Sequence, residues 1–218
     1  MAVYDLEEQE QLDELKTWWK QYGNHVTTLL LTAALALAGW QGWNWWQRDQ
    51  AAQASALFFG VQQAANEGNA QHARELAGEL IEKYPRTNYA GLAVLLAART
   101  QVDKGDARNA KAQLQWCADN ARDPSLRELA RLRMAAILLD EKAYEEAMKQ
   151  LAAPAVIFSA RNAELRGDVL ASQGKKDEAR TAYQSALEYS SKDMVGGASD
   201  TAYREVLQSK LESLGASQ

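Results

Sequence analysis

The feature that most constrains this chain is a long apolar run near its N-terminus. Between Lys20 and Arg48 the sequence contains no Asp, Glu, Lys or Arg. A helix rises about 1.5 Å per residue and a bilayer core of about 30 Å needs roughly 20 residues, so Val26 to Trp46 is long enough to cross it. The run therefore predicts a transmembrane helix, with an anchor over residues 23–47.

The distribution of tryptophan supports this interpretation. Six of the seven tryptophans lie in two groups at the two ends of the run. Trp and Tyr favour the headgroup zone, where a ring can lie half in lipid and half in water. We therefore expect two membrane-interface belts, formed by Trp18, Trp19 and Tyr22 before the run and by Trp40, Trp43, Trp45 and Trp46 at its end.

A cleaved signal peptide is the competing interpretation of the same run. Ala36-Leu37-Ala38 before Gly39 resembles a small-x-small cleavage site. Residues 1–20 carry a net charge of −4, however, whereas a signal peptide begins with a positive region. This charge favours an uncleaved anchor, and a cleaved, secreted repeat protein stays open as the alternative.

Residues 1–22 form an acidic leader ahead of the anchor. Apolar residues recur at spacings of three and four from Leu12 to Tyr22, which predicts a short amphipathic helix. Its apolar face either lies on the membrane or a partner, or the leader is simply solvated, and both interpretations stay open. Two lysines precede the run and only Arg48 follows it closely, so the positive-inside rule places the N-terminus in the cytoplasm by a margin of one charge.

The composition of residues 51–218, beyond the anchor, limits the possible fold and partners of this part. Residues 51–218 carry a net charge of −1 and contain no basic stripe, which argues against nucleic acid as a partner. Cys117 is the only cysteine, so no internal disulfide can form. Three prolines in the whole chain and heavy use of Ala, Leu, Glu, Gln and Arg predict an all-helical domain.

Four segments of this part share one spacing. Each has a turn that begins with Gly or Lys and an alanine five residues later. The turns begin at Gly68, Gly105, Lys142 and Gly174, and the alanines are Ala73, Ala110, Ala147 and Ala179, which are 37, 37 and 32 residues apart. This is the pattern of tetratricopeptide repeats, helix-turn-helix units of about 34 residues. The fold class predicted for the chain is all-α: a transmembrane helix, then a solenoid of about four hairpins plus a capping helix over residues 51–214.

The fourth repeat matches the tetratricopeptide pattern best. Gly167 and Ala179 are small and let two helices approach, Tyr183 fills the space beside them, and Gly174 ends a helix in the left-handed conformation. In the first repeat, Tyr84-Pro85 closes the second helix.

The third repeat departs from the pattern. Ala135 replaces the glycine, and Pro154 occupies a position where a small helical residue belongs, so its second helix is predicted to end early. Asp200 is predicted to cap a last helix over Thr201–Leu214.

The sequence contains no constellation that suggests catalysis. The two histidines, His25 and His72, are far apart, and neither is spaced with Cys117 as a metal site requires. The many carboxylates fall in turns and on polar helix faces, where a solvated surface explains them. We therefore predict a protein that is not an enzyme and has no catalytic, cofactor-binding or metal-binding residues.

A repeat solenoid usually binds a polypeptide. In the tetratricopeptide family the groove residues come mainly from the first helix of each hairpin. That resemblance implies five candidate groove residues, which are Arg99, Leu132, Arg161, Glu164 and Asp168. For each of them taken singly, ordinary helix surface stays an open interpretation.

The chain as a whole resembles the YfgM family, the ancillary subunits of the bacterial SecYEG translocon. The likeness is carried by Leu12 to Trp19, Gly39 to Asn44, Tyr89 to Ala93, Leu165 to Asp168 and Gly174 to Lys176. The order of the parts carries it too, with an acidic leader, one Trp-flanked anchor and about four repeats. Trp45 and Trp46 depart from the family pattern, because they add aromatic rings at the second belt.

The resemblance implies a single-pass bacterial inner-membrane protein with a cytoplasmic N-terminus and a periplasmic repeat domain. Its implied partners are the SecYEG translocon, a membrane-anchored periplasmic chaperone of the peptidyl-prolyl isomerase type, unfolded or emerging polypeptides, and the lipid bilayer. Its implied work is to link emerging proteins to periplasmic chaperones, with a role in envelope stress regulation and without catalysis. The alternative is a membrane-anchored repeat scaffold for another cell-envelope assembly.

Overall fold

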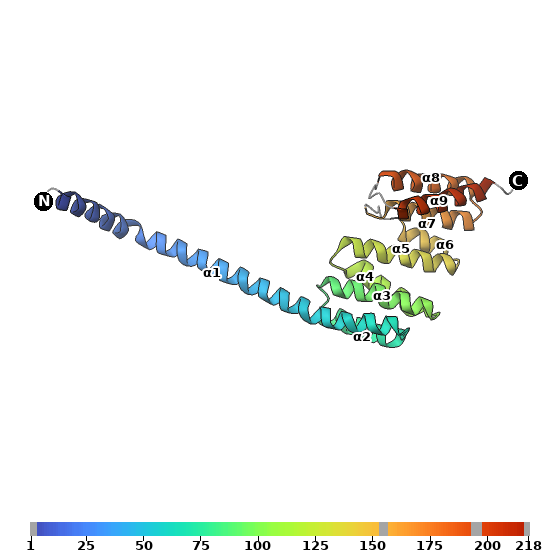
Figure 1. Cartoon of the computed structure of the whole chain (residues 1–218), viewed down its shortest axis with the longest axis horizontal. Coiled ribbons are helices and arrows are strands. Elements are labelled where there is room, and N and C mark those ends of the chain that lie inside the picture. Colours follow the sequence, from blue (N-terminus) through green and yellow to red (C-terminus); the bar gives the residue numbers. More distant parts are fainter. Residues whose placement is uncertain (1–3, 153–156, 193–197, 216–218) are drawn as a thin grey trace. The chain divides into compact units, whose positions relative to one another are not determined.

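A computed structural model describes residues 4–152, 157–192 and 198–215, and Figure 1 shows their helices. Within these ranges the secondary structure is helical and contains no strand. The chain divides into two compact units, Met1–Gln50 and Ala51–Gln218, and each is described by itself. The all-α fold with one long apolar N-terminal helix, predicted from periodicity and composition, is confirmed.

The first unit consists of the N-terminal part of α1 (Tyr4–Asn66). The short, separate leader helix predicted to end at Tyr22 is not seen, because the helix passes through Gly23 and the apolar run without a break. The segment contains no proline. A glycine such as Gly23 costs only about 1 kcal/mol in a helix, so the backbone hydrogen bonds of the helix can continue through it. The division into a leader over 1–22, an anchor over 23–47 and a domain over 51–214 stays a prediction.

The apolar run of α1 is long and apolar enough to cross a membrane, and its side chains are exposed. Its threonine hydroxyls donate hydrogen bonds to carbonyls one turn earlier in the helix. The Thr28 hydroxyl donates to the Asn24 carbonyl at 2.7 Å, and the Thr32 hydroxyl donates to the Thr28 carbonyl at 2.8 Å. Such internal bonding suits a segment in lipid, where no water is at hand to accept a hydrogen bond.

The second unit is built from helical hairpins. The last part of α1 pairs with α2, α3 pairs with α4, α5 with α6 and α7 with α8, and α9 packs on α8. The bounds are α2 (Ala70–Lys83), α3 (Asn88–Asp103), α4 (Ala107–Asn120), α5 (Pro124–Asp140), α6 (Tyr144–Gln150), α7 (Ser159–Ser172), α8 (Lys176–Lys192) and α9 (Ala198–Gly215). The predicted architecture of four hairpins plus a last helix is confirmed.

The turn of every hairpin has the same geometry. Gly68, Gly105, Lys142 and Gly174 all adopt a positive φ, between 61° and 80°. In each turn the next residue donates its N–H to the carbonyl five positions earlier, as Asn69 does to Ala64 at 2.8 Å. This is the Schellman motif, which needs a left-handed residue at this position. The four turns predicted from the repeat spacing are therefore confirmed.

The small positions of the repeats explain how closely the helices pack. The four alanines that define the repeat spacing are fully buried. A Cβ added to Gly167 would lie 2.5 Å from Cδ1 of Tyr183, so only glycine lets the Tyr183 ring lie against α7. The roles predicted for Gly167 and Tyr183 are thus confirmed.

The third hairpin is shorter than the others. Its second helix, α6, has seven residues, whereas α2 and α4 have 14 each. It ends early, as predicted, with Gln150 as its last residue, and Pro154 lies outside the described residues. The last helix differs from the prediction: α9 begins at Ala198, so Asp200 lies inside its first turn and is not the residue that precedes it.

Candidate functional site

The candidate site lies on the first helices of three hairpins. The repeat spacing makes four positions on α3 equivalent to four on α5, 37 residues later, and to four on α7, a further 32 residues later. Within each helix they follow at spacings of three, four and three, which places them on one face. We call this face the stripe, and it consists of Leu92, Leu95, Arg99 and Val102 on α3, Leu129, Leu132, Ala136 and Leu139 on α5, and Arg161, Glu164, Asp168 and Ala171 on α7.

Exposure follows the same order on all three helices. The second position of the stripe is buried each time, with Leu95 at 3 %, Leu132 at 6 % and Glu164 at 5 % exposed. The first and third positions are more open on every helix. A carboxylate on α7 therefore occupies the place that leucine occupies on α3 and α5. All five groove residues implied by the sequence belong to this stripe.

On α7 the stripe is bound to the chain's own last helix. Lys210 of α9 places its Nζ 2.8 Å from Oε1 of Glu164 and 2.8 Å from both carboxylate oxygens of Asp168. The Tyr203 hydroxyl donates to Oε2 of Glu164 at 3.0 Å, and Nη1 of Arg161 donates to the same oxygen at 2.9 Å. Glu164 is therefore buried and also fully engaged.

The electrostatics of this cluster favour the charged forms of Glu164 and Lys210. Burial alone would raise the pKa of Glu164, but the hydrogen bond and charge of Lys210 hold it below its ordinary value. Burial would likewise lower the pKa of Lys210, yet the two carboxylates raise it. The guanidinium of Arg161 also lies 4.4 Å from the centre of the Tyr203 ring, a cation–π contact.

The structure thus brings together three of the five predicted groove residues, Arg161, Glu164 and Asp168, as attachment points for α9. Sequence reasoning missed their partners. Lys210 offers a signal, because it lies within the last helix beside the apolar positions Leu207 and Leu211. A lysine bordering the apolar face of a capping helix suggests a buried carboxylate opposite.

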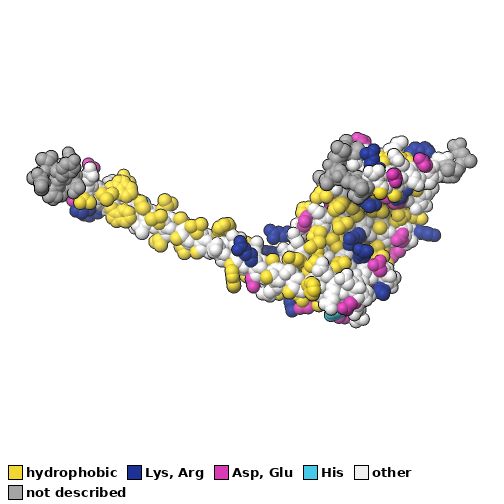
Figure 2. Space-filling model, viewed as in Figure 1, with side chains coloured by type: hydrophobic (Ala, Val, Ile, Leu, Met, Phe, Trp, Pro, Cys, Tyr) yellow, Lys and Arg dark blue, Asp and Glu magenta, His cyan; other side chains and the backbone are white. Residues whose placement is uncertain are grey.

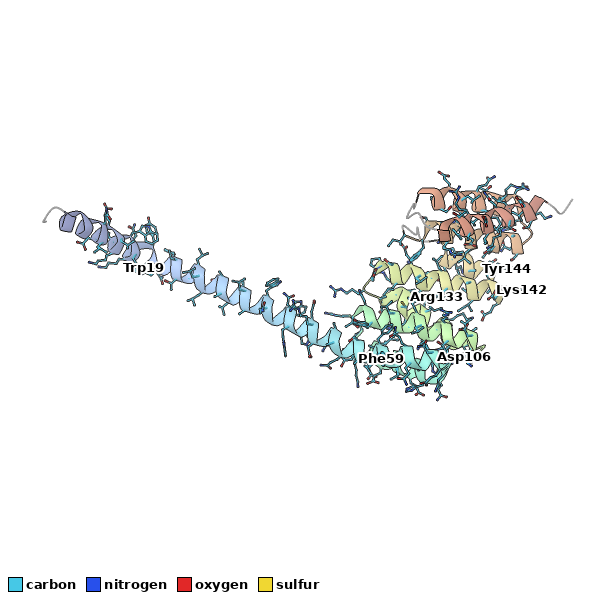
Figure 3. All side chains as sticks on the ribbon, in the orientation of Figure 1. Trp19, Phe59, Asp106, Arg133, Lys142 and Tyr144 are labelled. Carbon is cyan, nitrogen blue, oxygen red and sulfur yellow. The ribbon has the colours of Figure 1, made fainter. Side chains whose placement is uncertain are left out.

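The stripe on α3 is exposed at its first, third and fourth positions, and the corresponding positions on α5 are partly buried. Leu92 is 38 % and Val102 is 40 % exposed, and Figure 2 shows apolar side chains gathered over the middle helices with basic ones among them. Arg133, labelled in Figure 3, reaches from α5 to α3, where its Nη1 donates to the Leu95 carbonyl at 2.6 Å. The bond brings its guanidinium to the turn of α3 that precedes Arg99.

These two arginines have no acidic partner among the residues that the structure describes. Arg99 is exposed and belongs to no ion pair there, and Arg133 is only partly exposed. Burial lowers the pKa of Arg133, and the charge of Arg99 lowers it further. Two neighbouring guanidiniums in an apolar setting can attract an anion.

The described residues hold no group of three or more His, Cys, Asp or Glu able to bind a metal ion. Cys117 is buried, and burial raises the pKa of its thiol to about 11, so it packs as a small apolar side chain and not as a nucleophile. The arrangement on the stripe can bind and position a partner. It offers no general base beside a nucleophile.

The predicted membrane-interface residues all lie on α1. Each of the seven side chains is at least 45 % exposed. Neighbouring rings touch at both ends of the run, with centroids 5.9 Å apart for Trp18 and Tyr22 and 5.3 Å apart for Trp43 and Trp46. Their contact with headgroups stays a prediction.

A match to a known protein family agrees with this architecture. Residues 16–216 match the family model described as a tetratricopeptide repeat-like domain. The chain is also similar to the solved structure of MamA from Desulfovibrio magneticus, with a TM-score of 0.48 and 19% identity over 78% of this chain and 97% of that one.

The curated relatives share one name. The ancillary SecYEG translocon subunit of Neisseria gonorrhoeae is 35% identical, over 98% of this chain and 100% of that protein. The protein of the same name from Escherichia coli is 30% identical, over 86% of this chain and 90% of that protein. These relatives and the repeat domain indicate a family of scaffold proteins and not of enzymes. The chain therefore belongs to the YfgM family of ancillary SecYEG translocon subunits.

Proposed function

We propose that this protein is a non-enzymatic inner-membrane adaptor that associates with the SecYEG translocon. The observation that carries the proposal is the near full-length similarity to relatives named ancillary SecYEG translocon subunits. The exposed apolar run of α1, with its aromatic ends, supports a single membrane anchor. The one-charge excess of lysine before the run supports a cytoplasmic N-terminus and a periplasmic repeat domain.

The adaptor links emerging secreted or membrane proteins to periplasmic chaperones. Among these, a membrane-anchored chaperone of the peptidyl-prolyl isomerase type is the proposed partner, and envelope stress regulation is the proposed wider role. The family resemblance supports these finer assignments, and the exposed stripe positions on α3 support a domain that binds polypeptide.

Recovery of partners from the native membrane tests the translocon assignment. The full chain with a C-terminal tag is purified in mild detergent, and the co-purified proteins are identified by mass spectrometry. Translocon subunits are expected with the wild-type chain. The matched control replaces residues 23–47 with an unrelated membrane span, which separates binding by the anchor from binding by the repeat domain. A partner set from another envelope assembly, without translocon subunits, would overturn the proposal.

Protease access tests the sidedness. Protease is added to intact and to lysed spheroplasts, and the C-terminal tag is followed by blotting. Loss of the tag in intact spheroplasts is the expected result. A tag that disappears only after lysis would place the repeat domain in the cytoplasm and contradict the proposal. A mature protein that begins at Gly39 would instead establish the cleaved, secreted form.

A further inference from the structure

We propose that the α3–α5 part of the stripe docks a polypeptide segment with apolar side chains and a carboxylate, which binds between Arg99 and Arg133. The inference rests on the proposed function, because an adaptor for emerging chains needs a surface that accepts a polypeptide. Beyond the proposed function, the inference specifies which side chains the bound segment carries and which residues recognise them.

The apolar component of the surface comes from two helices in the same register. Leu92 and Val102 on α3 are exposed, and their equivalents Leu129 and Leu139 on α5 are partly buried. Beneath them the second stripe positions are closed by leucine. A segment lying across α3 and α5 would cover apolar side chains that now face solvent, at about 25 cal/mol for each Å² of apolar surface removed from water.

The charged component comes from the arginine pair. Arg133 is held on α3 by its bond to the Leu95 carbonyl, so its guanidinium is already positioned and little side-chain entropy remains to be lost on binding. The charge of Arg99 acts on it, and no carboxylate among the described residues does so. A carboxylate between them would remove the repulsion of two like charges and accept forked hydrogen bonds from guanidinium groups.

The other end of the same stripe shows how the chain itself handles such charges. There Lys210 has Glu164 and Asp168 within 2.8 Å, and α9 supplies the opposing charge. On α3 and α5 the cations are Arg99 of the stripe and Arg133 beside it, and neither forms an ion pair with a carboxylate among the described residues. The missing carboxylate is therefore expected from a partner.

Nucleic acid fits the surface less well than polypeptide. The repeat part of the chain carries a net charge of −1, and the two arginines sit among leucines. Binding to a phosphate backbone needs a run of cations, each contacting one phosphate. A single carboxylate with apolar neighbours matches both components of the surface.

Peptide binding to the full chain in lipid nanodiscs tests the inference. Three fluorescent peptides share one leucine-rich sequence and differ at a single central residue, which is Glu, Gln or Lys. Fluorescence anisotropy is expected to show the Glu peptide binding about tenfold more tightly than the Gln peptide, with the Lys peptide weakest. Absence of binding, or equal binding of the Glu and Gln peptides, overturns the inference.

Charge reversal assigns the preference to the stripe. Arg99 is exposed, so Arg99→Glu should leave the fold intact, weaken the Glu peptide about tenfold and strengthen the Lys peptide. The matched control is Arg108→Glu, at an exposed position of α4 outside the stripe, which should change neither affinity. If both variants change binding equally, the preference does not come from Arg99 and the inference fails.

The two proposals fail in different ways. Recovery of translocon subunits by the full chain does not depend on the peptide assay. A chain that recovers the translocon but shows no carboxylate preference removes only the present inference, whereas a chain that prefers the Glu peptide but never recovers the translocon removes the proposed function.

Discussion

The two ends of the stripe use the same helix positions for opposite purposes. On α7 the stripe carries Arg161, Glu164 and Asp168, and the last helix binds all three. On α3 and α5 the equivalent positions are apolar except for Arg99, and the first and third of them are exposed on α3 and partly buried on α5. Arg99 and its neighbour Arg133 have no acidic partner in the described chain. One repeat register can thus be covered at the end of a solenoid and exposed in its middle, because neighbouring helices decide what each face meets.

The largest expected effect on stability comes from removing Lys210, the cation with which α9 binds the α7 part of the stripe. Lys210→Ala leaves Glu164 with its remaining partners Tyr203 and Arg161 but without the ammonium that compensates its burial. We expect the free energy of unfolding to fall by about 2–3 kcal/mol, toward the low end for a broken buried pair because Lys210 is itself partly exposed. Urea unfolding of the full chain, followed by circular dichroism, measures it.

A double variant provides the control for this prediction. Glu164→Leu with Lys210→Met restores on α7 the leucine that α3 and α5 carry at the same position. It should unfold at a higher urea concentration than Lys210→Ala, because apolar residues of similar volume replace a buried pair at little cost. A double variant less stable than Lys210→Ala would show that the charges matter for more than their mutual compensation.

Glycine substitutions compare the packing of the two ends. Gly167→Ala would push a Cβ against the Tyr183 ring, and we expect a loss of about 2 kcal/mol. Gly91→Ala at the start of α3 would place its Cβ 2.9 Å from Cδ1 of Leu126, the flexible end of a side chain, and should cost less than about 1 kcal/mol. Equal losses in unfolding experiments would mean that both ends are equally rigid.

The pH dependence of stability distinguishes the α7 end of the stripe from the α3 part. The pKa of Glu164 is lowered in the folded protein, so its contribution to stability is present above the carboxyl's ordinary pKa near 4.5 and is lost as the pH falls through the folded value. Protection of α9 amides from hydrogen exchange should therefore fall on acidification before that of α3. Glu164→Gln should remove this early loss, and an unchanged acid response in that variant would contradict the assignment.

The smallest effect is expected from single arginines. Arg161→Gln breaks an ion pair to a buried carboxylate and a cation–π contact, but Arg161 is 60 % exposed, so we expect a loss of about 0.5–1 kcal/mol. Arg99→Gln on α3 should change stability by less than about 0.5 kcal/mol. A larger loss for Arg99→Gln would indicate an intramolecular partner and would weaken the docking proposal.

Local backbone requirements explain which parts of this molecule can be predicted. A Schellman turn needs a left-handed residue, so glycine marks three of the four turns, and the repeat spacing locates the fourth at Lys142. Small residues such as Gly167 mark close helix approach for a different reason, because a Cβ there would clash with the neighbouring helix. The continuity of α1 through Gly23 was not predicted, because helix ends depend on the sum of weak preferences over many residues.

The sequence by itself determined the apolar N-terminal helix, the number of hairpins, their turns and the register that makes positions of successive repeats equivalent, because periodicity and backbone conformation are local properties. Only the tertiary structure decided which part of the stripe is free. Lys210 and Glu164 are 46 residues apart, and their pairing exists only because α9 lies beside the last hairpin. The charge pairing of Arg161, Glu164 and Asp168, and its absence at Arg99 and Arg133, follows from which helices become neighbours.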